Sequence, residues 1–150
     1  ECLTDNRNRT AGEIRSIFDK SSGSLAGAGA VSWMFKKKYH FTVTGENADE
    51  EKLLEIVIDP GAENIEAEDG AAEIYGPPEA FEAISKALEN AGIKAEESGI
   101  IQVPDNYTDI KDISVARQVL SLVEKLEESD DVQAVYANFN IPPEILEQIQ

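Results

Sequence analysis

The sequence contains one cysteine and one histidine, and this scarcity excludes two kinds of site. A lone Cys2 cannot form an intrachain disulfide, which fits a reducing compartment. Cys2 and His40 together cannot provide the four ligands of a structural zinc ion, so we expect no metal site of that kind. We interpret Cys2 as a small buried strand residue rather than a reactive thiol, because no histidine neighbours it.

Long apolar runs and the common catalytic motifs are also lacking. No run approaches the roughly 20 apolar residues that a membrane-spanning helix needs, so we expect a cytoplasmic protein without a membrane partner. The sequence has no Gly-x-Ser-x-Gly, Walker or His-Glu-x-x-His motif, and pairs such as Glu50-Glu51 arise by chance among thirty acids. His40 alternates with apolar strand residues, so it is expected to face outward rather than act as a general base. We therefore predict a protein that is not an enzyme, uses no cofactor and works by binding.

Basic residues are few, and they are unevenly distributed. Thirteen Lys and Arg stand against thirty Asp and Glu, which gives a net charge of −17. Residues 1–38 nevertheless carry seven basic and four acidic side chains, whereas residues 39–104 carry three and sixteen, and residues 105–150 three and ten. Phosphate backbones attract clustered Lys and Arg and are repelled by acidic surface. Any nucleic-acid contact is therefore predicted in residues 1–38.

The middle of the chain has the periodicity of a ferredoxin-like unit. Apolar residues alternate where strands are expected and recur every three or four positions where helices are expected. Asn47 is a candidate N-cap, Asp69-Gly70 is a hairpin signal, and Pro77-Pro78 begins the second helix. The predicted order is βαββαβ: strand 39–43, helix 47–58, strands 65–67 and 72–75, helix 78–91 and strand 100–103.

The two flanks each supply part of a second layer. Thr10 and Glu13 form a Thr-x-x-Glu capping box that predicts a helix start at Thr10, with Ala11, Ile14, Ile17 and Phe18 as its apolar stripe. Short strands are predicted at 1–4, 31–35 and 132–139, a helix carries the apolar residues from 115 to 126, and Asn140 with Pro142 begins a last helix.

Neither flank forms a complete domain, so the simplest arrangement joins them. The predicted fold class is α+β, with two α+β domains. Residues 1–37 and 105–150 would form one discontinuous small α/β layer, and residues 38–104 the inserted ferredoxin-like domain.

The polar segment Asp5–Arg9 is the strongest candidate binding site. Asn6, Arg7, Asn8 and Arg9 stand just before the predicted helix, and Arg forks and Asn amides suit phosphate oxygens and base edges. Helix-start amides also attract anions. The alternative is that Arg7 and Arg9 pair with Asp5 and with acids of the C-terminal part, and the residue pattern leaves both interpretations open.

Two other segments are ambiguous. Lys36, Lys37 and Lys38 follow a predicted strand and either bind nucleic acid or protect a sheet edge. The loop Ser24–Gly29 contains Gly-x-Gly but lacks a third glycine and a strand–loop–helix context, so a connector is favoured over a phosphate cradle.

Three segments resemble the YebC/PmpR family. They are Glu1–Thr10 with Glu13-Ile14-Arg15, the stretch Ser22–Leu25 with Gly29–Ser32 and Phe35, and Asp130–Asn138 with the sequence DDVQAVYAN. They occur in order and cover both flanks, whereas the middle of the chain matches in pattern more than in wording.

The resemblance implies a non-enzymatic regulator of gene expression that binds DNA. It also implies a basic N-terminal helical domain that is absent here, so we interpret the chain as a fragment, namely the second and third domains. Nucleic acid, DNA or ribosomal RNA, would then be bound mainly by that absent domain and by residues 1–38, including Arg15. Alternatives are a ribosome-associated translation factor that contacts RNA, an acidic module that binds a ribosomal protein, and a small-ligand sensor.

Overall fold

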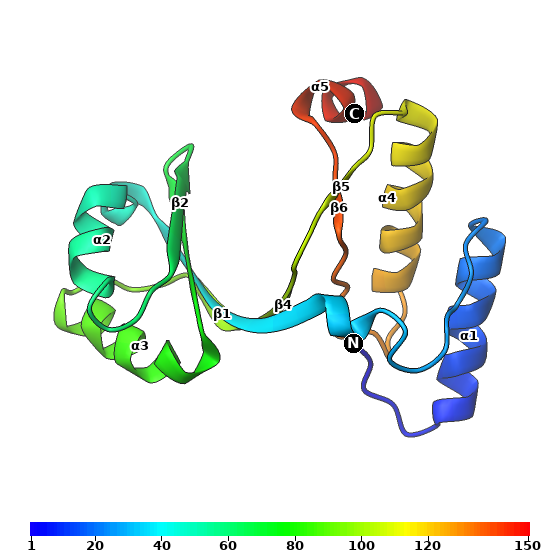
Figure 1. The fold of residues 1–150 in the computed structure, drawn as a ribbon, viewed down its shortest axis with the longest axis horizontal. Coiled ribbons are helices and arrows are strands. Elements are labelled where there is room, and N and C mark those ends of the chain that lie inside the picture. The colour runs from blue at the N-terminus through cyan, green and yellow to red at the C-terminus, as the bar shows by residue number, and fades with distance from the viewer. The chain divides into compact units, whose positions relative to one another are not determined.

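The computed structural model describes residues 1–150, which form two compact units. One unit contains residues 1–35 and 104–150, and the other contains residues 36–103. We call them the flanking unit and the inserted unit, and each is described by itself (Figure 1). Helices and antiparallel strands are both present, so the predicted α+β class is confirmed. No helix is long and apolar enough to cross a membrane.

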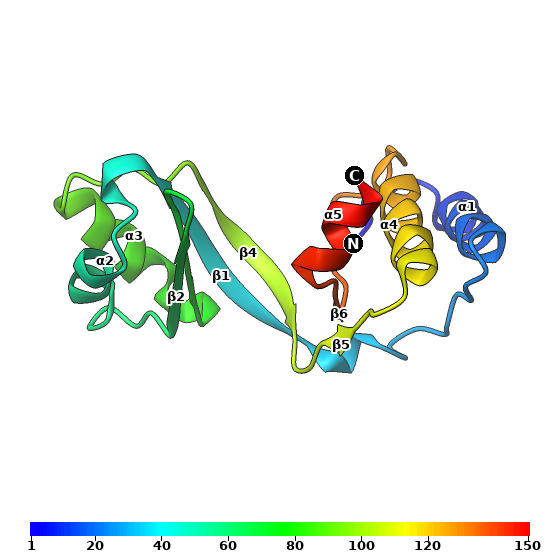
Figure 2. The same cartoon turned by 90° about the horizontal axis from the view of Figure 1, so that it is seen from above.

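The inserted unit has the predicted βαββαβ order. Its sheet has the strand order β2-β3-β1-β4, and β3 pairs antiparallel with both β1 and β2. Both helices cover the same face of this sheet (Figure 2). Its elements are β1 (Phe35–Thr44), α2 (Glu50–Val57), β2 (Asn64–Glu68), β3 (Ala71–Gly76), α3 (Phe81–Asn90) and β4 (Glu97–Pro104).

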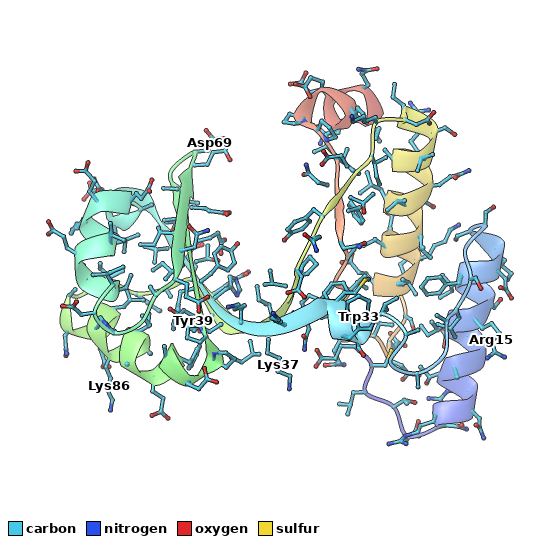
Figure 3. All side chains as sticks on the ribbon, in the orientation of Figure 1. Arg15, Trp33, Lys37, Tyr39, Asp69 and Lys86 are labelled. Carbon is cyan, nitrogen blue, oxygen red and sulfur yellow. The ribbon has the colours of Figure 1, made fainter.

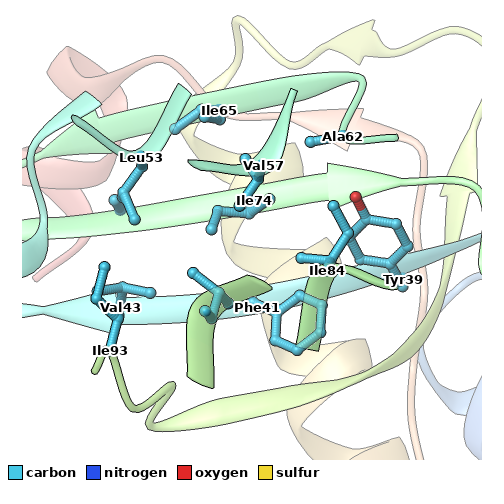
Figure 4. Close-up of a cluster of buried hydrophobic side chains, with 12 residues drawn as sticks. Tyr39, Phe41, Val43, Leu53, Val57, Ala62, Ile65, Ile74, Ile84 and Ile93 are labelled. Carbon is cyan, nitrogen blue, oxygen red and sulfur yellow. The ribbon is translucent and has the colours of Figure 1, made fainter. Parts of the chain in front are cut away.

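The core of the inserted unit follows from the alternation in β1. Tyr39, Phe41 and Val43 are buried, and the residues between them are not, because successive strand side chains point to opposite faces. Leu53 and Val57 of α2, Ile84 of α3 and Ile74 of β3 meet them in one cluster (Figure 4). Burial of these side chains against the helices is the main stabilising contribution of this unit.

Local turn chemistry explains two boundaries in the inserted unit. The β2–β3 hairpin turns at Asp69 and Gly70, which both have positive φ angles (50° and 79°), as the Asp-Gly pair predicted. The predicted cap Asn47 is wrong: it lies in a 3₁₀ turn, and α2 begins after Asp49, whose side chain accepts a hydrogen bond from the Lys52 amide. Asp49 lies immediately before the first helical residue, so it reaches the free amides that Asn47 cannot reach.

The flanking unit is built around three helices. Helix α1 packs beside α4, and α4 packs beside α5. Its core consists of Ile110, Ala116, Ile141 and Ile145, with partly buried apolar side chains around them. Its elements are α1 (Arg7–Lys20), a 3₁₀ turn (Ser32–Met34), β5 (Thr108–Asp109), α4 (Ile113–Glu127), β6 (Phe139–Asn140) and α5 (Pro143–Ile149).

Three strand predictions in the flanks are wrong in extent. The segment 31–35 forms a 3₁₀ turn, and the strand begins only at Phe35. The segment 132–139 is not one continuous strand. Its first residues pair with 1–3 through the Val132–Cys2 bridge and hydrogen bonds between Ala134 and Glu1, and its end pairs with β5. The predicted strand 1–4 is reduced to that same bridge. Alternation alone does not make a strand, because the backbone groups also need a neighbouring segment with which to pair.

Two single-residue predictions in the flanks are also wrong. Cys2 is free and exposed rather than buried, since its bridge to Val132 stands outside any sheet. Asn140 belongs to β6, and Pro142 occupies the N-cap position of α5 with Pro143 as the first helical residue. A proline needs no amide partner at a helix start, so the two prolines end the strand and begin the helix without a side-chain cap.

Candidate nucleic-acid interface

Helix α1 begins three residues before the capping box predicts, at Arg7 instead of Thr10. Asn6 is the N-cap: its backbone is extended, and its side-chain oxygen accepts a hydrogen bond from the Arg9 amide at 3.1 Å. This cap competes successfully with the Thr10 box, because Asn is among the strongest N-cap residues. Arg7, Asn8 and Arg9 therefore form the first turn of a helix rather than a loop in front of it.

The side chain of Thr10 does not cap the helix but forms a buried hydrogen bond. Thr10 is 4% exposed, and its hydroxyl donates to the Asp131 carboxylate at 2.7 Å. The Thr4 hydroxyl lies 2.7 Å from the Thr10 hydroxyl and accepts from the Asn6 amide at 3.0 Å. The start of α1 is thus hydrogen-bonded to Asp131, which is 121 positions from Thr10 in the sequence.

The same carboxylate holds one of the two candidate arginines. Arg9 Nη2 lies 2.9 Å from Asp5 Oδ1 and 3.3 Å from Asp131 Oδ2. The hydrogen bond from Thr10 is the main cause that lowers the pKa of Asp131. Burial opposes it, and the bond and charge of Arg9 lower the pKa further. The bonds to Asp131 and Asp5 raise the pKa of Arg9. Arg9 is therefore held by two acids, as one of the two interpretations of the sequence requires.

Arg7 differs from Arg9. It is exposed in the first turn of α1 and forms no ion pair, so the pairing interpretation describes Arg9 and not Arg7. Its guanidinium keeps all its donors available to an anion. Together with the amides of the first turn, Arg7 makes this end of α1 positive.

An exposed strip of residues also runs along α1. Asn8 and Arg15 are seven residues apart, hence two turns, and lie on the same face of the helix about 10 Å apart along its axis. Between them lie Ala11 and Gly12, both exposed, and Gly12 has open space where a side chain would stand. Arg15 projects from the helix into solvent (Figure 3). Ala11 thus belongs to this strip and not to the predicted apolar stripe, because Ile14, Ile17 and Phe18 suffice to cover the half-buried side.

The lysine run lies in the inserted unit, at the start of β1. Lys38 Nζ lies 2.6 Å from Glu63 Oε2, whereas Lys37 is exposed and unpaired, as Figure 3 shows. Strand β1 lies between β3 and β4 in the sheet, but its first residues extend beyond the ladder with β3, so edge protection and nucleic-acid binding both remain open for this run. The part of β1 that pairs with β3 begins at Tyr39, immediately after Lys36, Lys37 and Lys38.

The Ser24–Gly29 loop is a connector, and His40 lies on the outer face of the sheet. The Ser24–Gly29 loop is exposed and leads into the 3₁₀ turn, so no α-helix start follows its glycines. His40 is on the sheet face opposite the core, partly covered, with its Nε2 atom 3.5 Å from Glu73 Oε2 and 3.3 Å from Thr42 Oγ1. Its ring stacks on Tyr75.

The residue that sequence reasoning missed is Asp131. In the sequence it is only the second residue of the DDVQAVYAN segment, and its type and position there indicate no contact. Its role depends on a contact with Thr10 and Arg9 that no local pattern contains. Two of the quoted segments, the one with Arg9 and Thr10 and the one with Asp131, therefore meet in space.

Comparisons with known proteins found similar sequences that cover most of this chain. A family model described as "TACO1/YebC second and third domain" matches residues 1–139. A "probable transcriptional regulatory protein" of Elusimicrobium minutum is 42% identical over 149 residues, covering 99% of this chain. One with the same description from Halothermothrix orenii is 44% identical over 151 residues.

A solved structure has the same fold. The crystal structure of a conserved hypothetical protein from Aquifex aeolicus has a TM-score of 0.86 and 41% sequence identity, and it covers 97% of this chain. The chain spans about 60% of the length of each of these relatives and of that structure. From the family match and these identities, the chain belongs to the TACO1/YebC family, whose members include proteins named as probable transcriptional regulators.

Proposed function

We propose that this chain is part of a non-enzymatic regulator of gene expression and that it contacts DNA through α1. The contact surface would consist of Arg7 at the helix start and the strip from Asn8 to Arg15. One observation carries the proposal: in a chain with thirty acids and thirteen bases, these two arginines are exposed and paired with no acid. The names of the relatives support regulation of transcription.

The shape of the strip supports contact with a nucleic-acid backbone. Ala11 and Gly12 leave the middle of the strip without long side chains, so a backbone can approach the helix closely. Asn8 and Arg15 stand on either side of them, about 10 Å apart, which is roughly three steps of 3.4 Å along one strand. Arg7 would add a phosphate contact at the positive end of the helix.

Arg9 would have a different task. Its guanidinium is held by Asp5 and Asp131, so its charge is largely neutralised by acids within the protein. We assign it to fixing the first turn of α1, where it holds Arg7 and Asn8 in place. Lys37 of the inserted unit is exposed and would be a separate phosphate contact.

The test compares matched variants of this chain in DNA binding over a series of salt concentrations. Arg7→Ala with Arg15→Ala should weaken binding several-fold and reduce the salt slope by about one to two units, because two phosphate contacts are lost. The control, Lys52→Ala with Lys86→Ala, removes the same charge from the inserted unit and should leave the slope unchanged. Equal slopes in both variants would refute the assignment to α1, and tighter binding of RNA than of DNA would favour the translation alternative.

A second candidate function is suggested by α2. Leu54 and Ile58 are exposed on this helix, 45% and 50%, and Glu51 and Glu55 stand beside them. An exposed apolar pair rimmed by acids suits a basic amphipathic segment of a partner protein. The inserted unit as a whole carries six basic and sixteen acidic side chains, which favours such a partner.

The two functions separate by mutation. Glu51→Lys with Glu55→Lys should abolish binding of a basic partner protein. The salt slope of DNA binding, which depends on Arg7 and Arg15, should stay unchanged. A DNA-binding defect of the α2 variant as large as that of the α1 variant would argue against separate surfaces.

A further inference from the structure

A polar pocket lies in the flanking unit where the C-terminal end of α1 faces α4. It has a volume of about 260 Å³ and is lined by residues of both helices and of the turn after α1. Three of the lining side chains are basic, namely Lys20, Arg117 and Lys125. Such a pocket has room for a small tetrahedral anion, since one water occupies roughly 30 Å³ of liquid.

The charge of this pocket is opposite to that of the protein. Acids outnumber bases thirty to thirteen in the chain, yet no acid lines the pocket. Asp19 and Glu124 adjoin two of the basic residues in sequence, but their side chains do not line it. No ion pair neutralises Lys20, Arg117 or Lys125, and the guanidinium of Arg117 makes only a long hydrogen bond of 3.5 Å to the Gln148 carbonyl.

The positions on α4 explain how the cations converge. Arg117, Ser121 and Lys125 are spaced by four residues, so they form one row along the helix. The row spans about 12 Å at 1.5 Å per residue. Lys20 closes the pocket from α1, which packs beside α4. Three positive charges held near one another without a counter-ion repel, and an anion between them would relieve that repulsion.

Hydroxyl groups also lie around the pocket. Ser21, Ser22 and Ser121 all line the pocket. The Ser21 hydroxyl oxygen is buried and has no hydrogen-bond partner in the protein, which is unfavourable, and a rotation of this side chain toward the pocket would let a ligand complete it. Ser22 has a positive φ of 62°, so the turn that presents these two serines is a specific backbone conformation.

We propose that this pocket binds a dianionic phosphate group. Phosphate has more oxygens and more charge than a carboxylate, so it can satisfy three separate cations and several hydroxyls at once, whereas one carboxylate would satisfy a single fork. The ligand is either free phosphate, including a small phosphorylated molecule, or the terminal phosphate of a nucleic acid. Both sources present the same chemistry to the pocket.

This site is separate from the DNA surface of the proposed function. Arg7 and Lys20 are the first and last residues of α1, about 20 Å apart along the helix axis. A phosphate bound beside Lys20 therefore does not occupy the strip from Asn8 to Arg15. Loss of one binding activity leaves the other measurable.

The test is an NMR titration of the 150-residue chain with inorganic phosphate, with chloride at matched ionic strength as reference. We expect saturable shifts of the amides at 20–22 and 117–125. Lys20→Gln with Lys125→Gln should weaken phosphate binding at least about tenfold, since two charge-assisted contacts are removed. Lys86→Gln with Lys111→Gln makes the same change of charge elsewhere and should bind phosphate as the unmodified chain does.

A second variant guards against a folding defect. Ser121→Asp places a negative charge within the row of cations and should abolish the saturable shifts, while the amides of the flanking unit at the start of α1 and in α5 keep their positions. Shifts that stay linear with phosphate concentration, or that survive in both pocket variants, would overturn the proposal because they describe a diffuse ion atmosphere.

The source of the phosphate is decided by a short oligonucleotide with and without a 5′-phosphate. Stronger shifts of the pocket amides with the phosphorylated form identify a nucleic-acid end as a ligand. Shifts with inorganic phosphate alone identify a small phosphorylated molecule. If neither probe shifts the pocket amides, the site does not bind phosphate and the proposal fails, whatever the result for Arg7 and Arg15.

Discussion

The Thr10 hydroxyl donates a 2.7 Å hydrogen bond to the Asp131 carboxylate, and this contact joins the two sequence segments of the flanking unit at the start of α1. Backbone hydrogen bonds surround it: the Leu3 amide donates to the Asp131 carbonyl at 2.8 Å. The first turn of α1 and the DDVQAVYAN segment are therefore one structural feature. A change in either segment should alter how α1 presents its arginines.

Removing the hydroxyl of Thr10 should destabilise the flanking unit. Thr10→Val keeps the shape of the buried side chain and leaves Asp131 without its shortest bond, which should cost about 1–3 kcal/mol of unfolding free energy. Amide hydrogen exchange resolves the flanking unit from the inserted unit and measures the loss. The control Asp130→Asn alters the exposed neighbouring acid and should have little effect. Equal protection in the Thr10 variant and the unmodified chain would contradict the role given to this bond.

The pKa of Asp131 predicts an acid-labile flanking unit. This pKa is lowered, chiefly by the Thr10 hydrogen bond, so the ionised carboxylate stabilises the fold above the ordinary aspartate pKa of 3.8. That stability is lost as the pH falls through the lowered value. The stability difference between the unmodified chain and Asp131→Asn should therefore be largest near neutral pH and should shrink below about pH 4. A difference that stays constant from neutral to acid pH would assign the effect of the substitution to packing.

The N-cap of α1 offers a prediction about helix boundaries. Asn6→Ala removes the bond to the Arg9 amide and should cost about 1 kcal/mol, because Ala cannot cap. Asp49→Ala should cost a similar amount in α2, whereas Asn47→Ala, the cap expected from the sequence, should cost clearly less. Urea unfolding followed by hydrogen exchange compares the three. A larger loss for Asn47→Ala than for Asp49→Ala would restore the earlier helix boundary.

The inserted unit was predictable because its signals are local. Tyr39, Phe41 and Val43 alternate, Asp69-Gly70 sets the hairpin, and the two helices carry apolar stripes, so local pattern and final fold agree. The flanking unit was less predictable because its boundaries depend on distant partners. Thr10 carries a capping signal, yet it is buried against Asp131 while Asn6 caps the helix.

The segment that holds the candidate site was predictable, but the contacts of each arginine were not. The charge distribution directed attention to residues 1–38, and Arg7 and Arg15 are exposed there. Which arginine is available could not be read from the sequence, because Arg9 is paired with an acid 122 positions away. The pocket of the further inference was not predictable for the same reason: Lys20 is about 100 residues away from Arg117 and Lys125 in the sequence.

The Tyr39 ring packs against Gly76 so closely that any side chain at position 76 should destabilise the inserted unit. The two residues are opposite each other in the β1–β3 ladder, and a methyl group at position 76 would overlap the Tyr39 ring. Gly76→Ala should therefore destabilise the inserted unit by about 1–3 kcal/mol. The cost should be smaller in a Tyr39→Leu background, where the ring is gone, and a double-mutant cycle measures the difference. Equal costs in the two backgrounds would place the strain elsewhere, in the backbone at position 76.

The hydroxyl of Tyr39 leads to a prediction about alkaline pH. It is buried without a hydrogen-bond partner, and burial, aided by the charge of Glu63, raises the pKa of Tyr39 to about 12. The unfolded chain ionises Tyr39 near its ordinary value of 10.0, so its contribution to stability is complete below pH 10 and is lost between pH 10 and about 12. Tyr39→Phe should remove this part of the alkaline loss. At neutral pH it should be neutral or slightly stabilising, since it deletes an unsatisfied buried polar group. A clear loss of stability at neutral pH would mean that the hydroxyl is hydrogen-bonded after all, to water.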